Sequence, residues 1–183
     1  MRGTSFLSLL LILLPLGAQT EWKFAGLSNL PGFCGNYVNG KAAKAAFRMD
    51  PSVVTPAGKG ALEIAILQSS ATSNGSDIQI WLTQDKGLTP GKKYRLRLVM
   101  KASEAVQNAL SLQFIKNGAP YSAASKPGGA RISVGTDWKE QAFDLEALPA
   151  AEGVSLRFPD FFCGEIKAGT RLYLASASLV AAP

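Results

Sequence analysis

Hydrophobic and polar positions alternate strictly in two runs within residues 77–101, DIQIWLTQDKGLTPGKKYRLRLVMK. In the first half of this stretch, the Ile, Ile and Leu of 78–82 fall on one face of an extended chain, and Gln79 and Trp81 fall on the other. In the second half, Tyr, Leu, Leu and Met at even positions alternate with Arg, Arg, Val and Lys at odd positions. A period of two predicts β-strands with one buried face and one face in water. The stretch therefore predicts two strands joined by a Gly/Pro turn.

Apolar runs of strand length recur along the rest of the chain at spacings of roughly ten residues, separated by turn residues. Asn117-Gly118 is a strong turn signal, because both residues tolerate positive φ. The further strands are predicted over 61–67, 109–115, 131–134, 138–143, 154–158 and 171–180. Many short strands without a helical segment of ordinary length predict an all-β fold, an antiparallel β-sandwich.

The N-terminal part departs from this pattern. Residues 1–18 have the layout of a secretory signal peptide, with a basic Arg2, an apolar run over 6–16 and small residues at its end. An uncleaved anchor is the alternative, although the run is shorter than the ~20 residues of a membrane span. Residues 19–57 are rich in Gly, Pro and Asn and predict an irregular arm with one short strand. KAAKAAF at 41–47 has helix-favouring composition but is short for a helix.

Length and composition narrow the class of protein. The part after the signal, about 165 residues, suffices for one domain, with the sandwich over 58–183. We expect a secreted protein, extracellular or periplasmic, with no membrane span after signal cleavage. The net charge of +6 comes from basic residues spread along the chain, which argues against nucleic acid. The charge favours acidic partners such as uronic or sulfated polysaccharides, or serves solubility alone.

The two cysteines, Cys34 and Cys163, would be exposed to an oxidising compartment. A disulfide between them is the prediction, and two unpaired thiols are the alternative. The chain has no histidine, which excludes His-dependent nucleophilic arrangements and His metal sites. A glycosidase would need only two carboxylates on a shared cleft, and no pattern in the sequence pairs any two of the acidic residues. We predict that the protein is not an enzyme.

Trp81 is the residue from which a candidate binding face can be built. Its neighbours occupy the buried face, so its indole falls on the other face, where an aromatic ring can stack on a pyranose. Gln79 is ~7 Å away on the same face, and its amide both donates and accepts hydrogen bonds. The same alternation adds residues from other strands, and one loop tyrosine flanks the face. The predicted ligand-binding residues are Gln79, Trp81, Arg97, Gln113, Tyr121 and Arg157.

Two alternatives apply to this face. The N-terminal arm would cover it if both faces of the sheet are buried, and each single arginine would be an ordinary surface charge. Tyr94 and Trp138 fall on the inward register or at strand starts and are predicted to be core residues.

Four motifs occur in a fixed order along the chain. They are GKGALEI at 58–64, LTPGKKYRLRLVMKAS at 88–103, TDW at 136–138 with alternation to Phe143, and RLYL at 171–174 continuing through Leu179. Together they resemble carbohydrate-binding modules of families 4, 9, 16 and 22, over roughly residues 58–180. The resemblance implies a galactose-binding-domain-like jelly roll whose concave sheet face binds a glycan.

The family also implies a structural calcium ion held by aspartates in the closing strand. This sequence has Ala175-Ser176 at that place, which leaves the set of hard oxygen ligands short of charge. We therefore expect no metal and no other cofactor.

The leading hypothesis is a secreted, non-catalytic carbohydrate-binding module for an oligosaccharide or polysaccharide. A secreted structural or protein-interaction β-sandwich without sugar binding is the main alternative, and a small glycosidase or lyase is a third. Such modules are usually appended to a glycosidase. A separate secreted enzyme or surface protein is a further candidate partner.

Overall fold

The computed structural model describes residues 20–70, 76–163 and 166–182. The predicted signal peptide at 1–18 lies outside these residues. No helix within the described ranges is long and apolar enough to cross a membrane.

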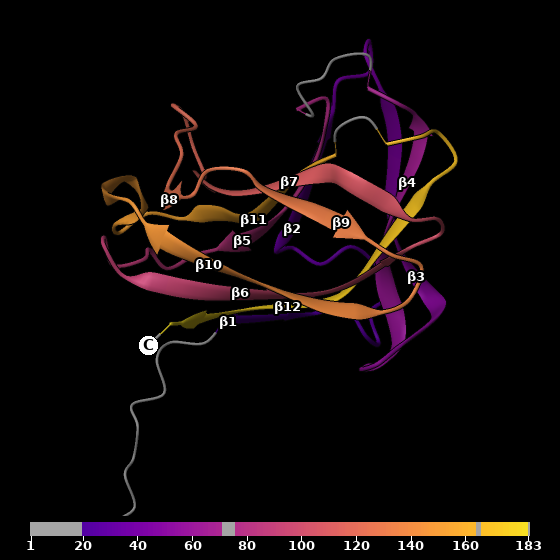
Figure 1. Ribbon diagram of the computed structural model, residues 1–183, viewed down its shortest axis with the longest axis horizontal. Helices are drawn as coiled ribbons and strands as arrows, with labels where there is room; N and C mark the ends of the chain where they lie inside the picture. The colour runs from indigo at the N-terminus through magenta and orange to yellow at the C-terminus, as the bar shows by residue number, and fades with distance from the viewer. Residues whose placement is uncertain (1–19, 71–75, 164–165, 183) are drawn as a thin grey trace, which may run out of the picture.

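The chain forms two antiparallel sheets packed face to face, as the alternation predicts (Figure 1). The larger sheet has the order β3 (Lys44–Thr55), β4 (Gly58–Gln68), β12 (Arg171–Ala181), β6 (Lys93–Ala102), β10 (Lys139–Ala147) and β8 (Ser125–Lys126), with β1 (Thr20–Lys23) also paired to β12. The smaller sheet has the order β2 (Cys34–Val38), β5 (Ile78–Gln84), β11 (Leu156–Cys163), β7 (Val106–Lys116) and β9 (Ala130–Val134). A short 3₁₀ turn, η1 (Pro149–Ala151), joins β10 to β11. The all-β prediction is confirmed. Most strands predicted from residue 58 onward are present, but the strand predicted over 154–158 forms over Leu156–Cys163, and β8 was not predicted.

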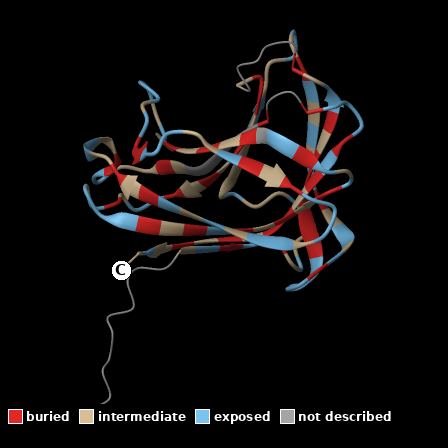
Figure 2. Cartoon of the chain, in the orientation of Figure 1, coloured by how far each residue is buried: buried red, intermediate tan, exposed pale blue. Residues whose placement is uncertain are grey.

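The core lies between the sheets and is built by the alternating residues. In β5, Ile78, Ile80 and Leu82 are buried, whereas Gln79 and Trp81 are half-buried on the opposite face. The same alternation runs along β6, and Figure 2 shows buried and non-buried residues succeeding one another along the strands. Burying one such Ile or Leu side chain contributes about 1.5–3 kcal/mol. The side chains on the outer face of the smaller sheet, Gln79 and Trp81 among them, are therefore not part of the core.

The predicted irregular arm over 19–57 is instead largely strand. It supplies β1, β2 and β3, which join both sheets. In β3, Phe47 and Met49 turn inward while Ala46 and Arg48 are exposed, a period of two that the alanine-rich composition hides. Pairing with the long strand β4 overrides the helix preference of alanine, because an isolated short helix is marginal in water.

The predicted disulfide between Cys34 and Cys163 is not formed, and the strand register explains its absence. Cys34 pairs with Leu82 of β5, whereas Cys163 directly follows Phe162, the partner of Gln79 on β5. Measured along β5, the two cysteines are thus offset by roughly four residues, about 13 Å. They also lie on different strands, β2 and β11, and β5 lies between these two strands. Bridged cysteines need Cα atoms within ~7 Å of each other. Burial raises the pKa of the Cys34 thiol to about 12.

The two aromatic residues predicted for the core have different environments. Tyr94 is buried, and its hydroxyl accepts a hydrogen bond from the Thr89 N–H at 3.0 Å. Trp138 is only half-buried, so its assignment to the core is wrong. Its Nε1–H donates to the Val54 carbonyl at 2.8 Å, and the Lys101 ammonium lies 5.1 Å from its ring centre. Trp138 therefore lies on the outer surface of the larger sheet.

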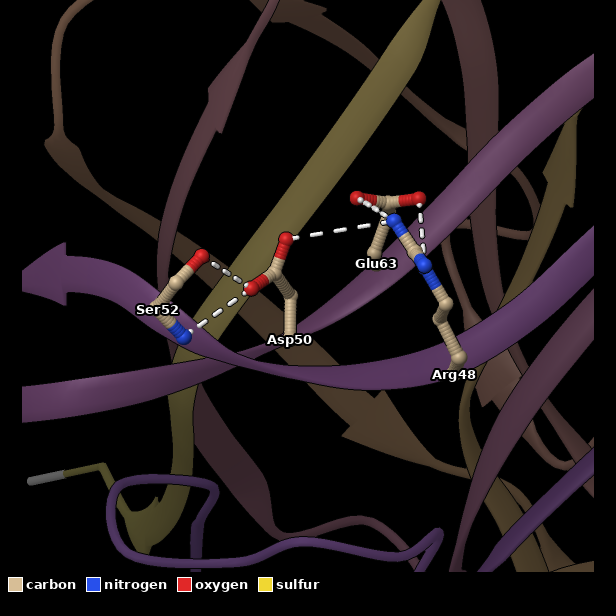
Figure 3. Close-up of polar contacts among 4 residues, drawn as sticks. All are labelled: Arg48, Asp50, Ser52 and Glu63. Carbon is tan, nitrogen blue, oxygen red and sulfur yellow. Dashed lines mark hydrogen bonds and ion pairs between the residues drawn. The ribbon is translucent and has the colours of Figure 1, made fainter.

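A polar cluster on β3 and β4 holds a buried carboxylate (Figure 3). The Glu63 side chain is 2% exposed and receives two hydrogen bonds from the Arg48 guanidinium, at 3.0 and 3.3 Å. These contacts raise the pKa of Arg48. Asp50 accepts hydrogen bonds from the Ser52 hydroxyl at 2.6 Å and from its N–H at 3.0 Å, and they lower the pKa of Asp50. Glu63 is thus engaged in a structural ion pair.

Candidate functional site

A cleft of about 560 Å³ opens on the outer face of the smaller sheet. Its described lining residues are Asn36, Tyr37, Asn39, Ser76, Asp77, Gln79, Trp81, Ile115, Tyr121 and Arg157. The cleft brings together four of the residues predicted from sequence, namely Gln79, Trp81, Tyr121 and Arg157. Its size falls within the ~300–1,000 Å³ that is usual for small-molecule sites.

The position of the Trp81 indole depends on a glycine in the neighbouring strand. Gly35 of β2 pairs directly with Trp81 of β5. A Cβ at position 35 would contact Cε2 of the indole and lie 2.5 Å from both Cζ2 and Nε1, well inside van der Waals contact. Because Gly35 has no side chain, the indole can lie over β2. The glycine thus provides the space that the aromatic floor of the cleft occupies.

Arg157 of β11 covers this floor. Its guanidinium carbon lies 3.8 Å from the Trp81 ring centre and 4.6 Å from the Tyr121 ring centre. Its Nε–H donates to the Asn117 side-chain oxygen at 3.2 Å. A guanidinium over an aromatic face is attracted by the ring quadrupole. The arginine thereby occupies part of the aromatic surface that the sequence predicts for sugar stacking.

Two exposed tyrosines stand on either side of this floor. Tyr37 lies on β2 and is 50% exposed, and Tyr121 follows β7 and is 60% exposed. In the sheet, β5 and β11 lie between β2 and β7. Sequence reasoning missed Tyr37, although CGNYV places it on the same face as Gly35 by simple alternation. These two rings are the accessible aromatic surfaces of the cleft.

Hydrogen bonds fix the polar groups at the end of the cleft. The Gln79 side-chain N–H donates to the Ser76 carbonyl at 2.7 Å, which leaves its side-chain oxygen as an acceptor. Asp77 is 6% exposed, and its two oxygens accept hydrogen bonds from the Asn39 amide at 2.9 Å and the Ser70 hydroxyl at 2.6 Å. Asp77 therefore holds the segment after β2 against β5, and sequence reasoning missed this role.

The other two predicted site residues lie elsewhere. Arg97 is on β6 in the larger sheet and forms an ion pair with Glu140 at 3.5 Å, so its placement beside Trp81 is corrected. Alternation predicts which face a residue takes but not which sheet its strand joins. Gln113 is on β7 of the smaller sheet, with Asp160 of β11 opposite it, and is not among the described lining residues.

A second ion pair on the larger sheet, between Arg95 and Asp144, changes the pKa values of both groups. Arg95 of β6 binds Asp144 of β10 through two hydrogen bonds, at 2.7 and 2.8 Å. These bonds lower the pKa of Asp144 and raise that of Arg95. Both groups are exposed, so this pair belongs to the surface of the larger sheet.

The closing strand does not fit a calcium ion. Ala175 is buried and its carbonyl accepts the Phe24 N–H at 3.3 Å, while Ser176 pairs with Val99 and Lys23. Within the described ranges, no group of three or more acidic, cysteine or histidine residues is placed to hold a metal. Asp77 is the one carboxylate among the described lining residues of the cleft, where acid–base hydrolysis of a glycoside would use a pair.

Comparison with family models finds no match, and no curated protein matches the sequence. Solved structures do match. A solved structure of CBM4 has a TM-score of 0.61 and 18% identity, covering 81% of this chain and 86% of its own. The solution structure of CtCBM11 has a TM-score of 0.60 and 14% identity, covering 92% and 98%. The chain has the jelly-roll fold of carbohydrate-binding modules.

A third module extends this likeness. The CBM22-1 xylan-binding domain of Paenibacillus barcinonensis Xyn10C matches with a TM-score of 0.57 and 10% identity, covering 91% of this chain and 96% of its own. These structures are matched along nearly their whole lengths and are binding modules. The jelly-roll prediction from the four motifs is confirmed. At such low identity the likeness establishes the fold, and a statement about ligands must rest on the cleft itself.

Proposed function

We propose that this chain is a secreted, non-catalytic module that binds an oligosaccharide or polysaccharide in the cleft of the smaller sheet. The observation that carries the proposal is the pair of exposed rings, Tyr37 and Tyr121, on either side of the Trp81–Arg157 floor. Pyranose rings present C–H-rich faces that bury apolar area against aromatic rings. A groove with an aromatic residue at each wall fits a chain of sugars lying across the sheet.

The polar groups of the cleft suit sugar hydroxyls. The Gln79 side-chain oxygen is oriented by the hydrogen bond from its own amide N–H to the Ser76 carbonyl, so it can accept a hydrogen bond from a sugar hydroxyl without further ordering. The signal-like segment at 1–18 and the module-type fold support export and a glycan outside the cytoplasm.

Affinity electrophoresis through gels that contain neutral or acidic polysaccharides tests the proposal. Tyr37→Ala and Tyr121→Ala should each weaken retardation by roughly tenfold, since a lost stacking contact of about 1.4 kcal/mol corresponds to that factor. Trp81→Ala should abolish retardation, because it removes both the aromatic floor of the cleft and the ring that Arg157 contacts. Tyr173→Ala, a half-buried tyrosine on the larger sheet, is the matched control and should leave retardation unchanged.

Equal mobility of the folded wild-type protein in every gel would overturn the proposal. The structural or protein-interaction hypothesis would then be preferred, because the Trp81 surface covered by Arg157 would be a packed feature of the sheet.

A further inference from the structure

We infer that the cleft recognises an acidic glycan, with Arg157 binding the carboxylate of a hexuronic acid residue. The inference rests on the proposed function and adds the chemical class of the ligand. The pairing of charges leads to it. Arg48, Arg95 and Arg97 each have a carboxylate partner. Arg131, Arg157 and Arg171 have none among the side chains that the structure describes, and of these three only Arg157 is among the described lining residues of the cleft.

The contacts of Arg157 leave most of its donors available. A guanidinium has five N–H donors that point outward in its own plane. The Trp81 and Tyr121 ring centres lie 3.8 and 4.6 Å from the guanidinium carbon, and a cation–π contact of this kind uses none of these donors. One donor, at Nε, is used by Asn117. The two terminal nitrogens can therefore present the fork that matches a carboxylate bidentately.

The charge balance of the cleft points the same way. The single described acidic residue of the lining, Asp77, is almost fully buried and has both oxygens hydrogen-bonded to neighbours. Arg157 is half-buried, so its positive charge faces the cleft more directly than the negative charge of Asp77 does. The overall charge of +6 adds a general attraction for polyanions. The aromatic contacts also restrict the arginine rotamer, which lowers the ordering cost of binding.

The test uses three polyuronates, namely polygalacturonate, alginate and hyaluronate, each beside its carboxyl-reduced form. Isothermal titration calorimetry with the full chain should show binding of at least one polyuronate, and a reduced form that binds at least ten times more weakly. Affinity for the acid form should fall as NaCl rises from ~50 to ~500 mM, because the Debye length shrinks over that range.

Two variants assign the effect. Arg157→Gln should weaken binding of the polyuronate at least tenfold, and Arg157→Lys should recover only part of it, because a lysine lacks the planar fork. Arg171→Gln removes one positive charge from an exposed arginine outside the cleft and should change affinity less than twofold. If Arg171→Gln weakens binding as much as Arg157→Gln does, net charge explains the affinity and the inference is overturned.

The remaining outcomes separate this inference from the proposed function. Binding of a carboxyl-reduced or neutral polymer at least as tightly as its acid form would overturn the acidic ligand and leave the sugar-binding module standing. Failure to bind any polymer, acidic or neutral, would overturn both.

Discussion

Replacing Gly35 by alanine is expected to disturb the cleft floor without touching a residue that contacts ligand. The new Cβ would lie 2.5 Å from the Trp81 Nε1, whereas ordinary contacts begin near 3.4 Å. The indole must therefore withdraw by about 1 Å, either off the sheet or toward β11. Arg157 already lies 3.8 Å from the ring centre, so both movements break or distort the stack.

The expected cost follows from the contacts that are lost. Overpacking costs about 1–3 kcal/mol, and loss of the Arg157 contact adds about 0.5–1 kcal/mol. The reduced freedom of the unfolded chain returns about 0.4–1 kcal/mol. We expect Gly35→Ala to lower the free energy of unfolding by about 2 kcal/mol, together with a changed near-ultraviolet circular dichroism spectrum.

Urea unfolding measures this cost, and Gly32→Ala is the matched control. Gly32 lies three positions earlier on the same segment, and nothing lies within 4 Å of the place that its new methyl group would take, so its substitution should be neutral or slightly stabilising. If both variants unfold with the same free energy and Gly35→Ala keeps the wild-type spectrum, the stacked floor is not what positions Trp81.

Three further results are expected. Reducing agent should leave the unfolding midpoint unchanged, because no disulfide is present, and Cys34 should alkylate slowly at pH ~8 since burial raises its pKa to about 12. The free energy of unfolding should fall as pH drops below ~4, because hydrogen bonds lower the folded-state pKa values of Asp50 and Asp144 and stabilise their ionised forms, and stability curves between pH ~2 and ~6 check this. Arg48→Met should lower the melting temperature more than Glu63→Gln does, because the first change leaves a buried carboxylate without its partner and the second leaves an exposed guanidinium in water; equal shifts in differential scanning calorimetry would contradict this.

The sequence predicts the sandwich from residue 58 onward because alternation is strong where one face is buried. The strand prediction is wrong before residue 58 because the pattern is obscured locally. Alanine is small enough for either face, so the period of two in β3 is hard to detect, and the Gly and Asn of β2 resemble a loop. Both strands form because β4 and β5 offer long partners, which is tertiary information that a single sequence does not contain.

The candidate site could likewise be predicted from the sequence only in part. Trp81 and Gln79 can be assigned to the outer face because their own strand alternates, and Arg157 lies near them because β11 pairs with β5. The prediction for Arg97 is wrong because alternation does not reveal which sheet a strand joins. The stack of Arg157 on Trp81 depends on side-chain rotamers and on the space left by Gly35, and neither can be read from spacing.

The cleft draws its walls from distant parts of the chain, since β2 contributes one side and the segment after β7 contributes the other. A glycan that spans both walls would link the edge strand β2 to the segment after β7, on the far side of β5 and β11. Local opening of β2 would then require release of the glycan, which adds about 2.7 kcal/mol to that opening at a ligand concentration of ~100 times Kd. Amide hydrogen exchange in β2 would therefore slow on binding. Exchange in this one edge strand would then measure how far the whole cleft is occupied.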